Sequence, residues 1–550
     1  MKSVNSIKII PFGGLGYIGK NMTLFEYRDS IIIVDCGIMF PSEDMPGIDY
    51  VIPDFTYLIK NKNKIKGLVV THGHEDHIGA VPFLLQHMNI PIYATKLTIG
   101  LIQSRLIERP AREEPVFHEV SPRDRIHIGS FMIEFIRVNH SIIDGVGLAI
   151  QTDIGSIIHS GDYKIDFSPV DSNVTDIYRF ADYGEKGVLL LMSDSTNAER
   201  EGFTKSESVL VKKLIEIFSS ARGRIIVTTF ASNIHRIQQV FDVSQRYNRK
   251  VLISGLTMQK NIEIAHSMGY LKFKDDLIID VKHANSLPEK RIVVIGTGSQ
   301  GEPMSALARI ANGTHRHLTA QKGDTVIITA SVIPGNERTV TNIINTLMKL
   351  GADVYYDQDE DIHVSGHGST KELKLLISIT RPKFFMPIHG EYKHLKAHAK
   401  IAESLNIKPG NIIIAENGNV LELTKSTFAK TGTIPLAQMY VDGNEIGDIT
   451  NSVITERHVM STEGVFIVFI VLSEGLLLRD PDIVSRGFLN DGNEKALTSI
   501  KKQSKEIATR LLKTNVSQDD LRFSLKKDLT KYINKLTKRD PIIEIVVVEV

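Results

Sequence analysis

The sequence predicts an α/β protein with more than one domain, and three observations support this prediction. The chain of 550 residues is too long for a single hydrophobic core, and its composition, 42% hydrophobic and 23% charged, is that of a globular protein. Short β-branched runs dominate the first 205 residues. From about Ser206, amphipathic helices alternate with strands, which is typical of parallel βαβ units in an open sheet.

Strands predominate in residues 1–205. Gly, Asp or Asn residues separate short apolar runs such as SIKIIPF, MTLFEY, SIIIVDCG, KGLVVTHG, FMIEFIRVNHS, VGLAIQTD and GSIIHSGDY. One helix is expected to begin at Ile78 and to contain AVPFLLQHM.

The remaining elements are expected in the following order. In residues 206–364, two helices alternate with the strands RIIVTTF and KVLISG, and RIVVIGTG, TVIITA and ADVYYD follow. Two more helices and the strands KFFMPIHG and NIIIAEN occupy residues 365–425. Residues 426–450 resemble a connector, and residues 451–550 a small α+β unit with two Lys-rich helices.

Bulk properties restrict the function. The net charge of +1 gives no overall positive field, so a polyanion would have to be held by local sites. Cys36 is the only cysteine, which suits a reducing cytoplasm. The N-terminus lacks the apolar stretch of a signal peptide, and the runs VFIVFIVL (465–472) and IIEIVVVEV (542–550) are too short to cross a membrane. We expect these runs to be buried strands.

Two glycine motifs resemble nucleotide-binding loops. GLGYIG (Gly14, Gly16, Gly19) follows a strand, but a hairpin pattern comes next instead of the helix that a dinucleotide fingerprint must open. A tight turn is therefore favoured. GTGSQG (Gly296, Gly298, Gly301) has a strand before it and a helix after it, so a phosphate-facing loop and a structural turn are equally favoured.

The stretch VVTHGHEDHIGA (69–80) indicates a metal site. His72, His74, Asp76 and His77 offer imidazoles and a carboxylate, which are natural ligands of zinc. Their spacing is too tight for one helix face, so we expect a loop between a strand and a helix. One ion cannot easily use all four groups, whereas two ions can if a further carboxylate bridges them.

Further ligand candidates follow predicted strands downstream. His140 ends FIRVNHS, Asp162 ends SIIHSGDY and His389 ends FFMPIHG. A single histidine after a strand is usually structural, but three such residues together with HxHxDH favour a metal site. Asp35, which ends SIIIVDCG, is expected to orient a ligand.

These motifs resemble those of a known family. HxHxDH followed by isolated His, Asp and His is the pattern of the metallo-β-lactamase superfamily. Segments over essentially the whole chain are similar to bacterial ribonuclease J of the β-CASP group, among them FGGLGYIGKN, GIDYVIPD, SDSTNAE, TFASNIHRIQQ, TGSQGEPMSALARIANGTH, HVSGHGS and MPIHGEY. Tyr17 departs from the pattern, since the family often has an acidic residue there.

The resemblance implies a fold and a metal centre. Residues 1–205 and 365–425 would form a metallo-β-lactamase αββα sandwich, with a β-CASP α/β domain inserted at 206–364, a linker at 426–450 and a C-terminal α+β domain at 451–550. It implies two zinc ions per subunit and an activated water that attacks phosphorus. The ligands would be His72, His74 and His140 for one ion, Asp76, His77 and His389 for the other, and Asp162 as the bridge.

The resemblance also implies substrate-handling residues. Asp194 and His367 match two β-CASP motifs and are candidates for positioning the substrate and protonating the leaving 3′ oxygen. Without the resemblance, Asp194 suits a helix cap or turn equally well. The FASN and HVSGH loops would form a pocket for a nucleotide phosphate, made of Ser232, Asn233, His363, Val364, Ser365, Gly366 and His367.

This pocket implies a 5′→3′ exoribonuclease that prefers 5′-monophosphate ends, also cuts internally, and acts on single-stranded RNA in maturation and decay. The alternatives are a catalytically weak RNA-binding subunit of a ribonuclease complex, another metallo-β-lactamase-fold hydrolase, and a DNA-specific β-CASP nuclease. We expect a homo-oligomer (dimer or tetramer) or a hetero-oligomer with a paralogue, and no membrane partner.

Two features of the chain remain open. Residues 495–540 carry 13 Lys+Arg against 5 Asp+Glu, which suits either a solvated helix face or contact with RNA. Asp49 and Asp442 could hold a structural calcium ion, as some relatives suggest.

Overall fold

A computed structural model describes residues 5–42, 44–298, 305–330, 336–357, 361–443, 445–447, 451–489, 494–514 and 516–550. The chain divides into two compact units, which are residues 1–39 with 52–438, and residues 40–51 with 439–550. Gly301 of the GTGSQG motif lies outside the described residues.

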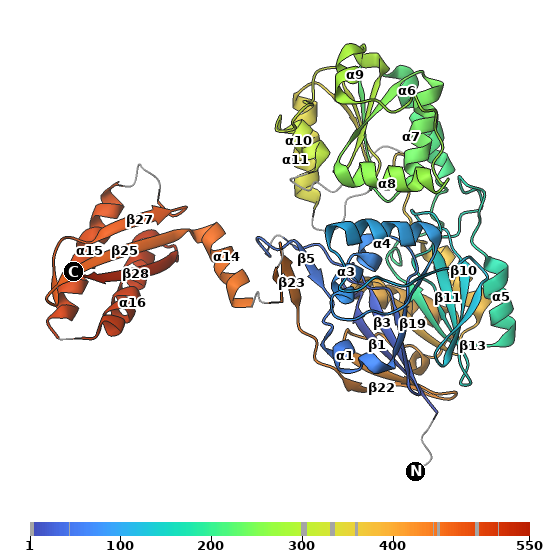
Figure 1. Cartoon of the computed structure of the whole chain (residues 1–550), viewed down its shortest axis with the longest axis horizontal. Helices are drawn as coiled ribbons and strands as arrows, with labels where there is room; N and C mark the ends of the chain where they lie inside the picture. The colour runs from blue at the N-terminus through green and yellow to red at the C-terminus, as the bar shows by residue number, and fades with distance from the viewer. Residues whose placement is uncertain are drawn as a thin grey trace. The chain divides into compact units, whose positions relative to one another are not determined.

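Two sheets form the centre of the first unit (Figure 1). The first has eight strands in the order β22 (Phe428–Thr433), β21 (Asn419–Leu423), β1 (Ile7–Gly13), β3 (Met22–Tyr27), β4 (Ser30–Val34), β6 (Ile65–Val69), β7 (Ile92–Ala94) and β8 (Phe117–Glu119). The second has six, in the order β19 (Phe384–Ile388), β13 (Val188–Asp194), β12 (Ser156–His159), β11 (Val146–Gln151), β10 (Phe131–Arg137) and β9 (Arg125–Ile128). One buried apolar cluster, which includes Phe25, Phe135 and Met386, draws residues from both sheets.

Helices cover the sandwich. A second buried cluster joins the outer side of the six-stranded sheet to α5 (Ile177–Lys186), α12 (Thr370–Thr380) and α13 (Tyr392–Ser404). The short helices α1 (Thr56–Lys60), α2 (Glu75–Ile78) and α3 (Val81–Leu85) and the longer α4 (Lys96–Glu108) accompany the eight-stranded sheet. This arrangement confirms the predicted αββα sandwich.

The inserted domain has a parallel five-stranded sheet of its own. Its order is β15 (Lys250–Ser254), β16 (Ile292–Gly296), β14 (Ile225–Thr228), β17 (Thr325–Ile328) and β18 (Asp353–Tyr355). The helices are α6 (Ser208–Ser220), α7 (Ile234–Arg246), α8 (Leu256–Ser267), α9 (Val281–Ser286), α10 (Ala306–Ala311) and α11 (Glu337–Lys349). The central strands are apolar and buried throughout, as expected when helices cover both faces.

The insertion leaves and re-enters the sandwich at neighbouring strands. β13 precedes the insert and β19 follows it, yet the two strands pair in parallel from Leu190 with Phe384 to Asp194 with Ile388. The insert is therefore bounded by two strands of one sheet.

Two local predictions differ from the structure. The helix expected from Ile78 consists of α2 and α3, because the metal motif forms the first helical turn itself and Pro82, which has no backbone N–H, sits at the start of α3. The connector expected at 426–450 contains β22, β23 (Met439–Asp442) and β24 (Glu445–Ile446). By contrast, β3 follows the GLGYIG stretch, whose three glycines have φ of 82°, 82° and 105°, so these residues form the expected turn.

The second unit is a sheet with helices on one face. β25 (Val465–Ser473) lies between β27 (Asp482–Arg486) and β28 (Ile542–Glu549), and also pairs with β26 (Leu476–Leu477). α15 (Glu494–Leu512) and α16 (Gln518–Thr537) pack on one side, and α14 (Asn451–Glu463) precedes β25. A small sheet contains β24, β23 and β5 (Tyr50–Ile52).

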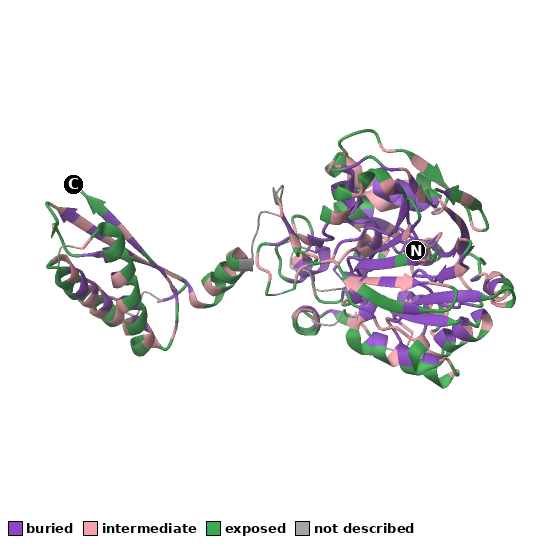
Figure 2. Ribbon diagram, turned by 90° about the horizontal axis from the view of Figure 1, so that it is seen from below, coloured by how far each residue is buried: buried purple, intermediate pink, exposed green. Residues whose placement is uncertain are grey.

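The two longest apolar runs are strands, but only alternate side chains are buried in them. Along β25, Phe466, Val468 and Ile470 lie against the helices, whereas Val465, Ile467, Phe469 and Val471 are only half-buried. Figure 2 colours the ribbon by burial and shows buried, intermediate and exposed positions mixed along this unit. Among the described residues, none of the helices has the length and apolarity that a bilayer span requires.

Candidate dinuclear metal centre

The predicted ligands gather at one edge of the sandwich because the strands that carry them run in the same direction. β10, β12, β13 and β19 are mutually parallel through their pairings, and His140, Asp162, Asp194 and His389 lie at or just beyond their carboxyl ends. β4 and β6 of the other sheet are also parallel to each other, and they deliver Asp35 and the HxHxDH loop.

Three histidines form the first cluster. His72 Nε2 and His140 Nε2 each lie 3.0 Å from His74 Nδ1. All three rings are largely buried, and their ligand atoms lie within 4.8 Å of one another. Three imidazole nitrogens converging on one point suit a shared cation.

The second cluster contains Asp76, His77, Asp162 and His389. His77 Nε2 lies 3.2 Å from Asp162 Oδ2, and His389 Nε2 lies 3.3 Å from Asp76 Oδ2 and 3.4 Å from Asp162 Oδ2. The same Asp162 oxygen is 3.8 Å from His72 Nε2 and 3.9 Å from His140 Nε2. Asp162 therefore lies between the two clusters.

The outward-facing ring nitrogens have partners that fix the orientation of the rings. His77 Nδ1 lies 2.8 Å from Asp35 Oδ2, His140 Nδ1 2.8 Å from the Gly366 carbonyl, and His389 Nδ1 2.7 Å from Thr196 Oγ1. Each contact leaves the inward nitrogen available as a ligand, as in known metal-binding histidines. The residues present therefore fit a metal site, and Asp35 has the contact expected of an orienting residue.

Electrostatics distinguishes the two clusters. Burial lowers the pKa of His74 to about 4 and the pKa values of His72 and His140 well below their usual range, so these rings are neutral. Burial also opposes protonation of His389, but Asp162 and Asp76 outweigh it and raise its pKa to about 9. Metal uptake at the second cluster is therefore expected to release protons.

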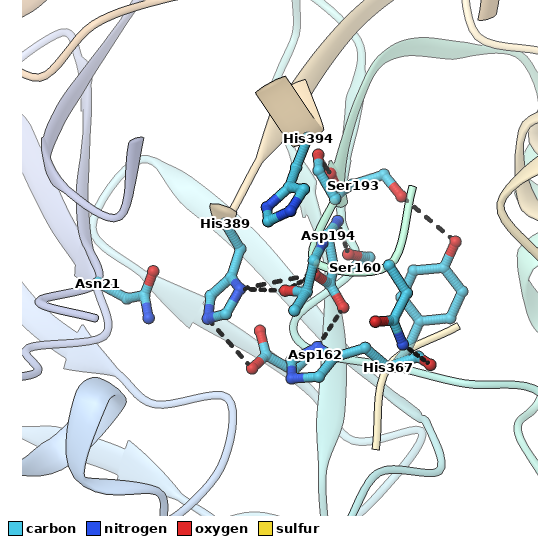
Figure 3. Close-up of polar contacts among 12 residues, drawn as sticks. Asn21, Ser160, Asp162, Ser193, Asp194, His367, His389 and His394 are labelled. Atoms are coloured by element: carbon cyan, nitrogen blue, oxygen red, sulfur yellow. Dashed lines mark hydrogen bonds and ion pairs between the residues drawn. The ribbon is translucent and has the colours of Figure 1, made fainter. Parts of the chain in front are cut away.

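Asp194 and His367 form a pair beside the second cluster (Figure 3). His367 Nδ1 lies 2.7 Å from Asp194 Oδ2, and Figure 3 shows these side chains together with Asp162 and His389. Asp194 Oδ1 accepts hydrogen bonds from the Thr196 backbone N–H at 2.9 Å and from Thr196 Oγ1 at 2.8 Å. The turn role that the sequence left open and the contact with His367 are thus both present.

The HVSGH loop lies close to this pair. Ser365 Oγ accepts hydrogen bonds from Asn197 Nδ2 at 2.8 Å and from the His367 backbone N–H at 3.2 Å. Val364 is buried, and His363 Nδ1 lies 3.1 Å from the Thr329 carbonyl.

The FASN loop lies between the start of α7 and the metal-binding loop. The buried Asn233 caps α7 by accepting a hydrogen bond from the Arg236 backbone N–H at 3.0 Å. Ser232 lines a small cavity together with Gly73 and Glu75 of the metal-binding loop and Lys260 of α8. This places Ser232 beside the metal-binding loop.

Buried charges connect the two loops, and the sequence did not indicate them. Arg236 donates hydrogen bonds to the Thr329 carbonyl and, at 2.7 Å, to Glu207 Oε2. Glu207 Oε1 lies 3.4 Å from Lys164 Nζ, which in turn lies 3.3 Å from the Ser365 carbonyl. All three charged side chains are 3% exposed or less.

Asn21 is another residue that the sequence did not single out. Its Nδ2 lies 3.2 Å from Asp76 Oδ2 and 3.0 Å from His77 Nε2, so it belongs to the surroundings of the second cluster. Its place after a turn of three glycines gave no chemical signal.

The proposed calcium ligands have other partners. Asp49 Oδ2 accepts a hydrogen bond from the Gly443 backbone N–H at 2.7 Å, and Asp442 forms an ion pair with Arg457 at 2.8 Å. Within the described ranges, the groups of at least three potential metal ligands do not include them.

Family models match most of the chain. The matches are to the beta-lactamase superfamily domain (residues 32–179), the ribonuclease J beta-CASP domain (222–347), the Zn-dependent metallo-hydrolase RNA specificity domain (358–410) and the ribonuclease J C-terminal domain (452–550). The first and third of these contain the predicted metal ligands, which agrees with a sandwich interrupted by an insert.

Individual proteins are similar over the full length. Ribonuclease J of Thermus thermophilus is 42% identical over 550 residues, covering 99% of this chain and 95% of the relative. Ribonuclease J2 of Bacillus subtilis is 37% identical and covers 100% of both chains. A crystal structure of a protein of unknown function from Enterococcus faecalis, 17% identical, covers 76% of this chain and all of that one with a TM-score of 0.53, which shows a shared fold alone. From the full-length identity to the first two relatives, the chain belongs to the ribonuclease J family.

Proposed function

We propose that this protein is a zinc-dependent ribonuclease that degrades RNA from the 5′ end and also cuts it internally, in the maturation and decay of cytoplasmic RNA. The observation that carries the proposal is the pair of ligand clusters that meet at Asp162, with Asp194 and His367 beside them. Every one of the seven expected ligands takes part in these clusters, which argues against a catalytically weak subunit.

The residues divide into metal holders and substrate holders. His72, His74 and His140 would hold one zinc ion, Asp76, His77 and His389 the other, and Asp162 would bridge them. Two bound zinc ions would supply an activated water and neutralise charge on the phosphoryl oxygens.

His367 would deliver the proton that the leaving 3′ oxygen needs. Burial opposes its protonation, but Asp194, 2.7 Å away, outweighs burial and raises the pKa of His367. The Asp194 carboxylate also fixes the ring through Nδ1, which leaves Nε2 to face the substrate. Asp194 is itself held by Thr196, so the proton donor has a defined direction.

The HVSGH and FASN loops would hold a 5′-terminal monophosphate. Because Ser365 Oγ accepts hydrogen bonds from Asn197 and from the His367 N–H, its own hydrogen is left to donate to a phosphate oxygen. Burial lowers the pKa of His363 to about 4, and the nearby positive charge of Arg236 contributes to this shift. A buried cation close to both loops suits an anionic ligand. The remaining members of this pocket would be Ser232, Asn233, Val364 and Gly366.

A time course on one RNA with either 5′ group tests this proposal. Wild-type protein should release mononucleotides from the 5′-monophosphate form much faster than from the 5′-triphosphate form. Ser365→Glu should slow this attack, because its carboxylate repels phosphate in a partly buried site. Ser426→Glu, on an exposed turn between β21 and β22, is the matched control and should behave as wild type. Equal rates on the 5′-monophosphate and 5′-triphosphate forms, or release of nucleotides from the 3′ end, would contradict the proposal.

We also propose that the protein self-associates through the second unit. The face of its sheet that the helices leave uncovered carries Val465, Ile467, Phe469 and Val471 of β25, with Ile542, Val546 and Val548 of β28 beside them. Glu544 of β28 and Asp482 and Arg486 of β27 also lie on this face, so it combines a group of apolar side chains with charged ones, which suits a subunit interface. A structural calcium ion at Asp49 and Asp442 remains a prediction, and its test is calcium content after dialysis.

A further inference from the structure

A groove on the second unit has a strongly basic lining. Its volume is about 690 Å³, and most of its lining residues belong to α15. The five cations are Lys501, Lys502, Lys505, Arg510 and Lys513, accompanied by Thr498, Thr509, Asp480 and Glu506. The opposite side of α15, with Ile500, Ile507 and Ala508, is buried against the sheet. The groove therefore lies on a firmly packed helix, on the side of the unit away from the uncovered sheet face.

The excess of basic residues in this chain is concentrated in the segment that contains the groove. Residues 495–540 carry 13 Lys+Arg against 5 Asp+Glu, so the other residues carry 52 against 59 and are net acidic. Taken together, the residues outside this segment therefore repel a polyanionic substrate weakly, whereas the segment attracts it. Attraction of such a substrate over distances of a Debye length would depend on the two helices of the second unit.

The cations are available to an incoming anion. Lys502 and Arg510 are 79% and 66% exposed, and Lys501 and Lys505 are 44% and 51% exposed. All four have acidic neighbours: Lys501 lies 3.5 Å from Asp482, Lys502 4.0 Å from Glu506, Lys505 2.6 Å from Asp480 and Arg510 2.5 Å from Asp528. Exposed ion pairs of this kind contribute little, so they leave the cations available to a phosphate.

We propose that this groove binds the sugar–phosphate backbone of single-stranded RNA. The inference rests on the proposed function, which makes RNA the polyanion that this protein meets. The described lining residues are amines, a guanidinium, hydroxyls and carboxylates, without aromatic or aliphatic side chains. Protein interfaces are enriched in aromatic residues and methionine and depleted in lysine, so this composition favours phosphates over an acidic protein partner. Since none of the described lining residues has a base-stacking side chain, binding is expected to be independent of sequence.

The test compares charge changes of equal size in two places. In the full-length protein, Lys501, Lys502, Lys505 and Lys513 are replaced by glutamine together. The matched control replaces Lys60, Lys62, Lys66 and Lys349, four exposed lysines of the first unit, in the same way. A third variant carries arginine at the four groove positions and should restore binding, which excludes misfolding as the cause of a loss.

Binding of a labelled single-stranded RNA of 30 nucleotides is measured in chelator, so that hydrolysis does not interfere, over a series of salt concentrations. Loss of four phosphate contacts should make the slope of log K against log salt less steep by about 3. The control and the arginine variant should keep the wild-type slope. Hydrolysis of a 5′-phosphorylated dinucleotide should be unchanged in all variants.

Three results would overturn the inference. The first is an unchanged slope in the groove variant. The second is an equal change in the control, which would mean that total charge alone matters. The third is a loss of binding to polyglutamate without a loss of RNA binding, which would identify an acidic protein as the partner. Absence of RNA hydrolysis in wild-type protein would refute the proposed function, whereas the binding result would stand by itself.

Discussion

Replacing Gly366 with alanine tests whether the metal centre depends on the loop behind His140. A Cβ added to Gly366 would lie 2.7 Å from both Nδ1 and Cε1 of His140 and 2.9 Å from the backbone nitrogen of Ser141. Carbon atoms do not approach other heavy atoms this closely, so the imidazole has to move and loses its 2.8 Å contact with the Gly366 carbonyl. Loss of such support typically weakens metal binding by roughly 10–100-fold. This factor corresponds to about 1.4–2.7 kcal/mol.

The assay is a zinc titration of the metal-free protein against a competing chelator, with metal content measured after dialysis. One of two zinc sites should weaken in Gly366→Ala, while circular dichroism and the thermal midpoint of the metal-free protein change little. Gly410→Ala is the control, because an added Cβ there meets nothing within 4 Å. Wild-type affinity at both sites in Gly366→Ala would refute the reasoning, whatever happens to RNA hydrolysis.

Three further predictions concern the ligands, the assembly and the buried charges. His74→Ala and Asp76→Ala should each abolish RNA hydrolysis and reduce bound metal without unfolding the protein, because both residues lie at the mouth of the sandwich; near-normal turnover by metal-stripped His74→Ala would contradict this. Deletion of residues 451–550 should lower the number of chains per particle, calculated from light scattering and the mass of the shortened chain, since it removes the uncovered sheet face; an unchanged number of chains would exclude that face as the interface. Burial would raise the pKa of Glu207, but Arg236 and Lys164 hold it at about 2, below its ordinary value of 4.5. Glu207 therefore stabilises the folded protein above pH 4.5, by about 3 kcal/mol, and this contribution is lost as the pH falls through 2. In urea unfolding, the difference between wild type and Glu207→Gln should shrink from pH 7 toward pH 2, and a constant difference would contradict the assignment.

The grouping of the candidate metal ligands could be predicted from the sequence, because coordination chemistry admits few residue types. His72, His74, Asp76 and His77 stand close together, and the other candidates each follow an apolar strand. The structure brings all of them into two clusters. Parallel strands end at a common edge, which is why isolated residues far apart in the sequence converge there.

The buried charges could not be predicted in the same way. Arg236 lies in a helix of ordinary amphipathic pattern, and charged residues are expected at the surface unless a partner is known. Its partners Glu207 and Lys164 are distant in the sequence, so only the tertiary structure reveals them. β22 escaped prediction for a different reason. It is an edge strand that is exposed at most positions, so its sequence, FAKTGT, lacks the alternation that marks a half-buried strand.

The pairing of β13 with β19 has a consequence for the folding of the chain during its synthesis on the ribosome. Synthesis runs from the N-terminus, so His72, His74 and His140 emerge early, whereas His389 emerges only after the entire inserted domain. Until then the six-stranded sheet has β13 as its open edge, and the second metal cluster lacks one of its ligands. Bridging so long an insert is not itself prohibitive, because the entropy of loop closure grows only with the logarithm of the length. If the protein has the proposed function, a partly synthesised chain would therefore lack a complete metal centre while it is still bound to the ribosome and its mRNA. Nuclease activity would begin only after the insert and His389 have been synthesised.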